Sequence, residues 1–128
     1  MGKRKRTLKQ RKAEGGKFNS VQVKTRYVRI APRKLRVVAD VVHGMPVGQA
    51  MTMLQFISKR GAKVVFKTLK SAVAAAENKG TLAMDKVYIS KITVDQGPAL
   101  KRWVPRARGM ASPIKKYLSH LTIELSDD

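Results

Sequence analysis

The sequence contains no cysteine, and its longest apolar runs are short. Without cysteine the chain cannot form disulfides, use a thiolate in catalysis or hold zinc through sulfur. The apolar run at 72–76 falls far below the roughly 20 residues that a membrane-spanning helix requires, and no apolar signal-peptide core follows the basic N-terminus. We therefore expect a cytoplasmic protein with no membrane partner.

Acidic residues are also scarce, because 8 Asp and Glu accompany 28 Lys and Arg, for a formal net charge of +20. This excess opposes compaction unless anions gather at the surface. Clustered cations gain affinity for nucleic acid by releasing the counterions that phosphates condense. We expect a polyanionic partner, above all nucleic acid, and keep an anionic membrane or another acidic surface as the alternative.

The few acids and two histidines form no catalytic or metal-binding pattern, and the sequence has no glycine-rich phosphate loop or zincin spacing. His43 and His120 are interpreted as structural or RNA-facing residues. Asp40 is interpreted as a local charge partner, because Arg36 and His43 lie three to four residues away on the same helix. The sequence thus predicts no enzyme, catalytic residue, metal, cofactor or small-molecule substrate.

Hydrophobic periodicity predicts one α+β domain over residues 21–128. Val21, Val23, Thr25 and Tyr27 alternate with polar residues, as expected for a strand with one buried face. The expected elements are a strand at 21–30, helices at 32–43, at about 47–57 and from about 62 to 79, and strands at 87–95 and 120–126. The strands predict a three-stranded, mainly antiparallel sheet that three helices cover on one side.

Residues 1–20 carry eight basic residues and one acid, with few large apolar side chains. Such a segment cannot bury enough surface to order itself, so we expect a basic extension that is disordered until it binds RNA. A plain solvated tail and a nuclear import signal in the KRKR cluster are the alternatives. The expected RNA-binding residues of this extension are Lys3, Arg4, Lys5, Arg6, Lys9, Arg11 and Lys12.

The segment QGPALKRWVPRARGMASPIKK, at 96–116, fits neither helical nor strict two-residue periodicity. We predict a protruding β-hairpin over about 95–120, with arms meeting near 106–109 and a projection of roughly 35 to 40 Å. A disordered loop is the alternative. An isolated ribbon of two strands is marginally stable in water. Its three prolines, Pro98, Pro105 and Pro113, each remove a donor from the ladder. The hairpin therefore needs packing from outside the chain.

Two further sets of basic residues are expected to contact RNA, mostly at phosphate and sugar. Cations at the start of the first helix oppose the helix dipole, which indicates an external anion there. The set on the first strand and helix comprises Lys24, Arg26, Arg29, Arg33, Lys34 and Arg36. The set on the hairpin comprises Lys101, Arg102, Arg106, Arg108, Lys115 and Lys116. A DNA-coating architectural protein is the rival hypothesis, and it would need a dimerisation face.

Three segments carry a resemblance to a known family: RIAPRKLRVVADVVHGMPVGQA at 29–50, SAVAAAENK at 71–79 and VDQGPALKRWVPRARGMASPI at 94–114. Over about residues 21–126 the sequence resembles the bacterial large-subunit ribosomal protein family called L twenty-two. The last segment is the most specific of the three. Residues 1–20 look like an added basic extension.

The resemblance implies a compact α+β domain near the mouth of the peptide exit tunnel and a hairpin threaded through large-subunit ribosomal RNA. It implies contacts with several RNA domains, with neighbouring large-subunit proteins and with the nascent polypeptide, as well as a role in subunit assembly. In the family, macrolide antibiotics bind near the hairpin tip. The motif places Lys101, Arg102, Trp103, Arg106, Arg108, Gly109 and Met110 at or near that tip. Trp103 and Met110 depart from the aliphatic and basic residues that are frequent there.

Overall fold

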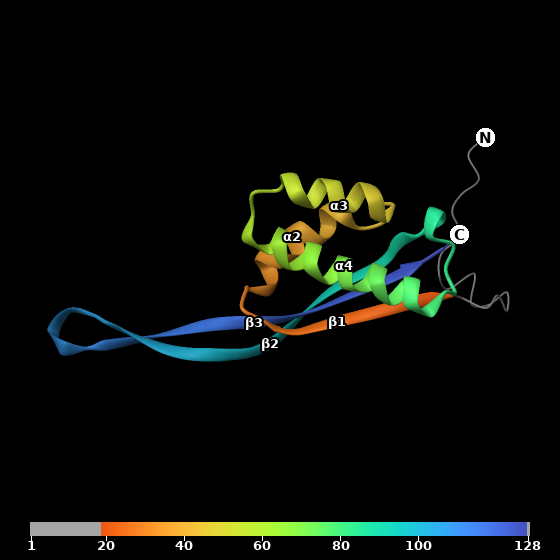
Figure 1. Cartoon of the computed structure of the whole chain (residues 1–128). Coiled ribbons are helices and arrows are strands. Elements are labelled where there is room, and N and C mark those ends of the chain that lie inside the picture. The colour runs from red at the N-terminus through yellow and green to blue at the C-terminus, as the bar shows by residue number, and fades with distance from the viewer. Residues whose placement is uncertain (1–18, 128) are drawn as a thin grey trace, which may run out of the picture.

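The computed structural model describes residues 19–127. The elements are β1 (Ser20–Val28), α2 (Pro32–Val42), α3 (Val47–Phe56), α4 (Arg60–Lys79), the short 3-10 helix η1 (Met84–Lys86), β2 (Tyr88–Pro105), the 3-10 turn η2 (Ala107–Gly109) and β3 (Ala111–Ser126). The strands form one antiparallel sheet in the order β1-β3-β2. The helices lie on one side of this sheet (Figure 1), which confirms the predicted α+β fold.

The helices form where the sequence places apolar residues at steps of three and four. In α2 the Pro32 ring suits the first turn, and Leu35 and Val38 are buried on the inner face. In α4 the small residues Ala72 and Ala76 are fully buried, so the helix lies close to the sheet. Gly80 ends α4 with a φ of 61°, a left-handed conformation that glycine adopts without a steric penalty.

A close approach of α2 and α4 depends on Gly61 in the first turn of α4. A Cβ atom at Gly61 would lie 3.2 Å from Cδ1 of Leu35 and 3.4 Å from Cγ2 of Val38. A larger residue there would force the Leu35 side chain to shift by at least a few tenths of an ångström. The starts of α2 and α4 are therefore neighbours in space, although they are far apart in the sequence.

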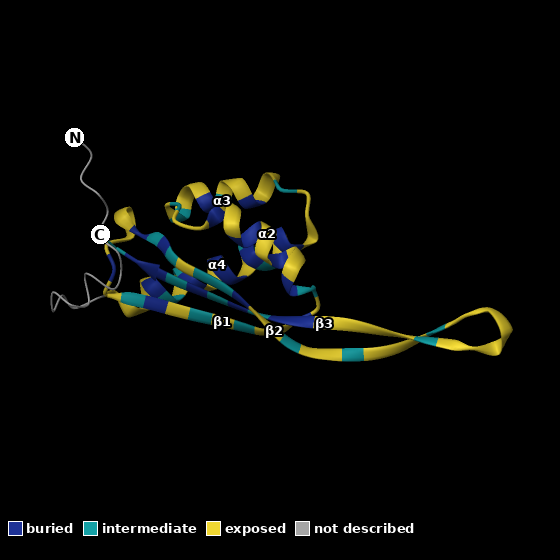
Figure 2. Ribbon diagram, turned by 180° about the vertical axis from the view of Figure 1, so that it is seen from behind, coloured by how far each residue is buried: buried dark blue, intermediate teal, exposed yellow. Residues whose placement is uncertain are grey.

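The central strand β3 supplies the floor of the core. Leu121, Ile123 and Leu125 are fully buried beneath the helices. The alternate residues of a strand point to the opposite face, and His120 and Thr122 are accordingly only partly buried. The sheet thus has one face in the core and one face that no described helix covers (Figure 2).

Strands β2 and β3 continue far beyond the helices as a two-stranded hairpin (Figures 1 and 2). Their pairing runs from Tyr88 opposite Ser126 to Pro105 opposite Ala111. The register shifts between Gln96 and Ala99, which places Pro98 in an irregularity where its missing donor does not interrupt the ladder. The predicted hairpin is confirmed, whereas the two strands expected at 87–95 and 120–126 are the inner halves of its arms.

The expected alternation of β1 fails at its end. The pairing with β3 is irregular between Thr25 and Val28, and Tyr27 between them has a φ of 56°. This irregularity turns Tyr27 outward, so that 62% of its surface is exposed, and buries Val28 instead. Tyr27 was wrongly expected on the buried face, because a two-residue period cannot reveal an inserted residue.

Candidate nucleic-acid interface

The hairpin tip is a tight turn with two successive residues in the left-handed region. Arg108 has φ 59° and ψ 34°, and Gly109 has a φ of 67°. The N–H of Met110 donates to the carbonyl of Ala107, and the N–H of Arg106 donates to the carbonyl of Met110. Two positive φ angles between paired strands define the type I′ turn, for which Asn-Gly is preferred. Arg108 therefore holds a strained backbone position at the tip of the molecule.

The hairpin pairs like charges and exposes its large apolar side chains. Lys101 lies directly opposite Lys115, a cross-strand arrangement that is destabilising unless an anion lies nearby. No acid lies between Asp95 and Glu124 in the sequence. Trp103, opposite Pro113, is 67% exposed, and Met110 is 69% exposed. Most of the surface of Trp103 and Met110 is thus left uncovered by the described chain, in agreement with a hairpin that needs packing from outside.

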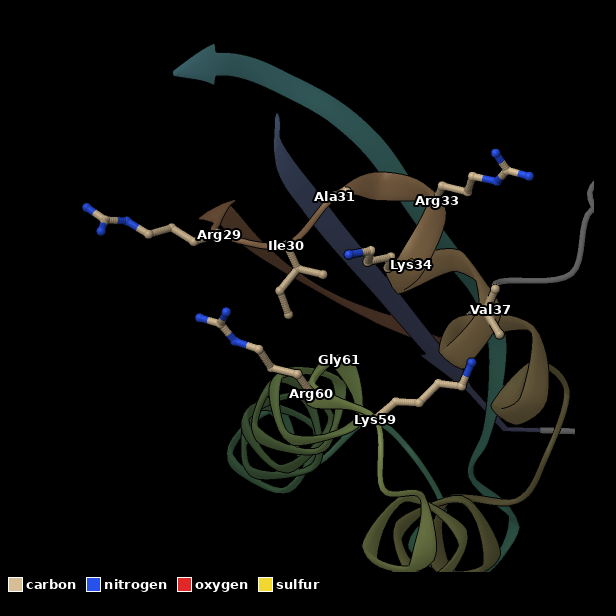
Figure 3. Close-up of a pocket in the computed structure, with 9 residues that line it drawn as sticks. All are labelled: Arg29, Ile30, Ala31, Arg33, Lys34, Val37, Lys59, Arg60 and Gly61. Carbon is tan, nitrogen blue, oxygen red and sulfur yellow. The ribbon is translucent and has the colours of Figure 1, made fainter. Parts of the chain in front are cut away.

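A cationic hollow lies between the starts of α2 and α4, and we call it the α2–α4 hollow (Figure 3). Its volume is about 680 Å³. Figure 3 shows Arg29 and Arg60 extending toward the same side, one from the end of β1 and the other from the start of α4. Five of the nine described lining residues are basic and none is acidic. The lining consists of Arg29, Ile30, Ala31, Arg33, Lys34, Val37, Lys59, Arg60 and Gly61.

Both helices that border this hollow begin without a capping side chain or an acid in the first turn, as far as the described residues show. Helix α2 follows Ala31, and α4 follows Lys59. Uncapped N–H groups and the positive end of the helix dipole attract anions. They add to the field of the five cations, so the hollow strongly favours a phosphate or another anion.

A second hollow adjoins the first at the root of the hairpin, and we call it the hairpin-root hollow. Its volume is about 330 Å³. Strand β1 leaves the sheet at Val28, opposite Ser119, so β3 beyond this point pairs only with β2 among the described strands. Arg29 and Arg60 line both hollows. The hairpin-root hollow is lined by Arg29, Arg60, Leu100, Arg102, Lys116, Tyr117 and Leu118.

Arg36 differs from the other cations of the first set because the fold engages its guanidinium. Nε and Nη2 of Arg36 donate to the carbonyl of Val94, at 3.3 and 3.1 Å. Val94 lies on β2 just before the hairpin leaves the sheet. Arg36 thus fastens α2 to the hairpin root, and its guanidinium is directed to the sheet, not along the helix to Asp40 as the sequence suggested.

Lys24 and Arg26 lie apart from the α2–α4 hollow. They border a shallow hollow of about 240 Å³ together with Tyr27, Asp95 and His120. Nδ1 of His120 accepts a hydrogen bond of 3.1 Å from the N–H of Tyr27, and the two rings meet edge to face. His120 therefore holds the irregular end of β1, in agreement with its interpretation as a structural residue.

The predicted cations of the first strand and helix lie in three separate places in the structure, and two further cations lie beside one group of them. Arg29, Arg33 and Lys34 meet at the α2–α4 hollow, where Lys59 and Arg60 join them. The sequence analysis missed these two residues. The signal that marked α2, cations in an uncapped first turn, is present at the start of α4 as well. The seven expected residues of the N-terminal extension lie outside the described residues.

Within residues 19–127, no cluster of three or more His, Asp or Glu side chains is arranged to hold a metal ion. In the same range no helix combines the length and apolar character needed to cross a bilayer. The features that the described structure does contain are a helix-covered sheet, a protruding cationic hairpin and two joined cationic hollows. They define a class of small basic α+β proteins with a protruding arm and a strongly cationic surface, features that suit a polyanionic partner.

A comparison with protein families shows which family within this class the chain belongs to. A family model described as "Ribosomal protein L22p/L17e" matches residues 23–126. The chain therefore belongs to this family of ribosomal proteins, which confirms the resemblance in its sequence. Membership makes it a structural protein rather than an enzyme.

Curated relatives agree with the family match over most of the chain. The large ribosomal subunit protein uL22 of Chloroflexus aggregans is 50% identical over 103 residues, which cover 80% of this chain and 91% of the relative. The protein of the same name from Aquifex pyrophilus is 47% identical over 114 residues, or 89% of this chain and 85% of the relative. The protein of the same name from Geobacter sulfurreducens is 49% identical over 104 residues, which cover 81% of this chain and 94% of the relative.

Proposed function

We propose that this chain is a structural constituent of the large ribosomal subunit in the cytoplasm and binds large-subunit ribosomal RNA. The hairpin is the observation that carries the proposal. It extends far from the core, pairs lysine with lysine and has no acid between Asp95 and Glu124. Such a hairpin is stabilised when phosphates neutralise its cations and planar bases pack against its exposed side chains, and folded RNA supplies both. The curated relatives are named as proteins of the large ribosomal subunit.

The proposal assigns RNA contacts to three surfaces of the chain. The two hollows and the hairpin take phosphates from several RNA domains, and Lys24 and Arg26 add contacts on the sheet face that no described helix covers. The third surface is the extension at 1–20, which orders along RNA beside a single domain at 21–128. By joining separate RNA segments, the chain assists subunit assembly.

The proposal also places the hairpin tip in the wall of the nascent-peptide exit tunnel. The type I′ turn with Arg108 and Gly109, together with exposed Trp103 and Met110, forms a narrow end that fits such a position. The nascent polypeptide and neighbouring large-subunit proteins are then further partners. Macrolide antibiotics would bind near the tip but need no pocket of this chain.

Sedimentation of cell lysate tests the assignment to the ribosome. We expect the chain to migrate with large subunits and to remain there through high-salt washing, because RNA encloses its hairpin. Lysate treated with DNase serves as the control and should give the same profile. Release from the subunit by salt would contradict an enclosed hairpin. An association with nucleoid that DNase abolishes would support the DNA-coating protein instead.

Chemical footprinting of intact subunits tests the buried hairpin separately. Trp103 and Arg106 are freely exposed in the chain by itself, so we expect both to react in the purified protein and to be protected in the subunit. Phe56, which is 81% exposed at the end of α3, provides an internal comparison. Equal reactivity of Trp103 in the free chain and in the subunit would contradict the proposed path of the hairpin.

A further inference from the structure

We propose that the two joined hollows bind one unpaired nucleotide of an RNA strand, with a phosphate in the α2–α4 hollow and the base in the hairpin-root hollow. This inference rests on the proposed RNA-binding function and specifies the kind of RNA segment that the surface accepts. Its first support is geometric. Arg29 and Arg60 line both hollows, so a group bound in one lies beside a group bound in the other.

The α2–α4 hollow has the chemistry of a phosphate site. Its five cations face no acid within the described lining, and the uncapped starts of two helices border it. Figure 3 shows the Lys34 side chain pointing toward Ile30, in the same general direction as Arg29 and Arg60 extend. A backbone phosphate at this side would meet an ammonium and two guanidinium groups. Guanidinium groups bind phosphate through two parallel hydrogen bonds.

The hairpin-root hollow differs because it combines cations with apolar and aromatic surface. Leu100 and Leu118 line it beside Tyr117, which is 41% exposed. Tyr117 lines this hollow together with Arg60, the first residue of α4. An aromatic ring next to arginines is the surface on which single-stranded nucleic acids stack a base.

The end of β1 explains why this space is open. From Ser119 toward the hairpin tip, the edge of β3 that faces away from β2 has no described strand beside it, because the pairing of β1 with β3 ends at Val28. A cavity of about 330 Å³ remains at this edge, near the lower limit of small-ligand pockets. One base fills such a space, whereas a duplex keeps its bases stacked inside and presents only phosphates and sugars. The preferred ligand is therefore a bulged or looped nucleotide.

Binding of two RNA probes to the full chain and its Tyr117 variants tests the proposal. The probes are a short unstructured strand and a duplex of the same length, compared by fluorescence anisotropy at a salt concentration that suppresses nonspecific binding. We expect Tyr117→Leu to weaken binding of the single strand about tenfold, since it loses one stacked base. Duplex binding should change little. Tyr117→Phe keeps the ring and should bind like the parent, whereas Arg60→Gln should weaken both probes.

The outcomes separate this inference from the proposed function. If Tyr117→Leu binds the single strand as well as the parent, or loses as much affinity for the duplex, the base site is wrong while RNA binding stands. If the parent chain binds neither probe, the proposed function itself fails. Should Tyr117→Leu not fold, a strand with one 4-thiouridine is photocrosslinked to the parent chain. A crosslink at Tyr117 supports the site, and crosslinks only elsewhere overturn it.

Discussion

The two halves of β3 have opposite surroundings although they belong to one continuous strand. From Ser119 to Ser126 alternate side chains are fully buried between the helices and the sheet. From Ala111 to Tyr117 nearly every residue is exposed. Antiparallel backbone pairing with β2 runs through both halves. Regular strand pairing alone therefore does not decide which part is stable: the inner half is held by apolar burial, and the outer half depends on a partner.

The largest effect should come from a large-to-small change in the inner half. Leu121→Ala removes a fully buried side chain from the middle of the sheet and should lower the free energy of unfolding by about 2–5 kcal/mol. Ile114→Ala, on the outer half of the same strand, should change it by about 0.5 kcal/mol or less. Urea unfolding followed by circular dichroism measures both. Equal losses would mean that the isolated hairpin is as well packed as the core.

A smaller loss should follow when the hydrogen bonds that hold α2 to β2 at the root of the outer half are removed. Arg36→Met removes both hydrogen bonds to the carbonyl of Val94 and should cost about 1–2 kcal/mol. Arg33→Met is the matched control, because Arg33 is an exposed neighbour on the same helix that lines the α2–α4 hollow. Urea unfolding should separate the two variants. A loss of RNA affinity without a loss of stability in Arg36→Met would show that Arg36 acts as an RNA contact.

Cations of the outer half should affect RNA binding but not folding. Replacing Lys115 and Lys116 together with Gln should reduce the slope of log K against log salt by about 1.5–2, because two phosphate contacts are lost. Unfolding in urea should not change. The control replaces Lys70 and Lys86, which carry the same charge but line neither the hairpin nor the two hollows. A slope equally reduced in the control would show a general charge effect with no particular role for the hairpin.

The smallest effect is expected at the tip. Arg108→Asn creates the Asn-Gly pair that a type I′ turn prefers and should stabilise the turn by up to about 1 kcal/mol. Hydrogen exchange of the Arg106 and Met110 amides, both bonded across the turn, measures this change. Arg106→Asn is the control, since it removes the same charge where φ is −122°. Slower exchange in both variants would attribute the effect to charge rather than to backbone strain.

Much of the fold could be predicted because local patterns and tertiary structure agree in this chain. Apolar residues at steps of three and four predicted α2 and α4, and the glycine after α4 predicted its end. The predicted bounds of both helices agree with the structure to within a few residues. The hairpin was predictable for a different reason. A segment with no acid, no period and three prolines suits neither a core strand nor a helix, and its turn was expected where the left-handed residues lie.

The remainder depended on contacts between distant residues. Lys59 and Arg60 line the same hollow as Arg29 because the starts of α2 and α4 lie close together at Gly61. The outward turn of Tyr27 follows from an irregularity that its partner strand, almost one hundred residues later, imposes. The role of Arg36 depends on a carbonyl of β2. None of these contacts produces a periodic pattern in the sequence, because each joins residues that only the packing of the fold brings together.

The position of β3 in the middle of the sheet has a consequence for synthesis. Strand β1 is the first described element to emerge, yet its only extended pairing is with the last, from Ser20 opposite Ser126 to Val28 opposite Ser119. The sheet can therefore close only after β3, the last described strand and the central one, has been synthesised. Until then β1 and β2 have no common strand to pair with, so the order of synthesis delays the formation of the core until its last strand is present.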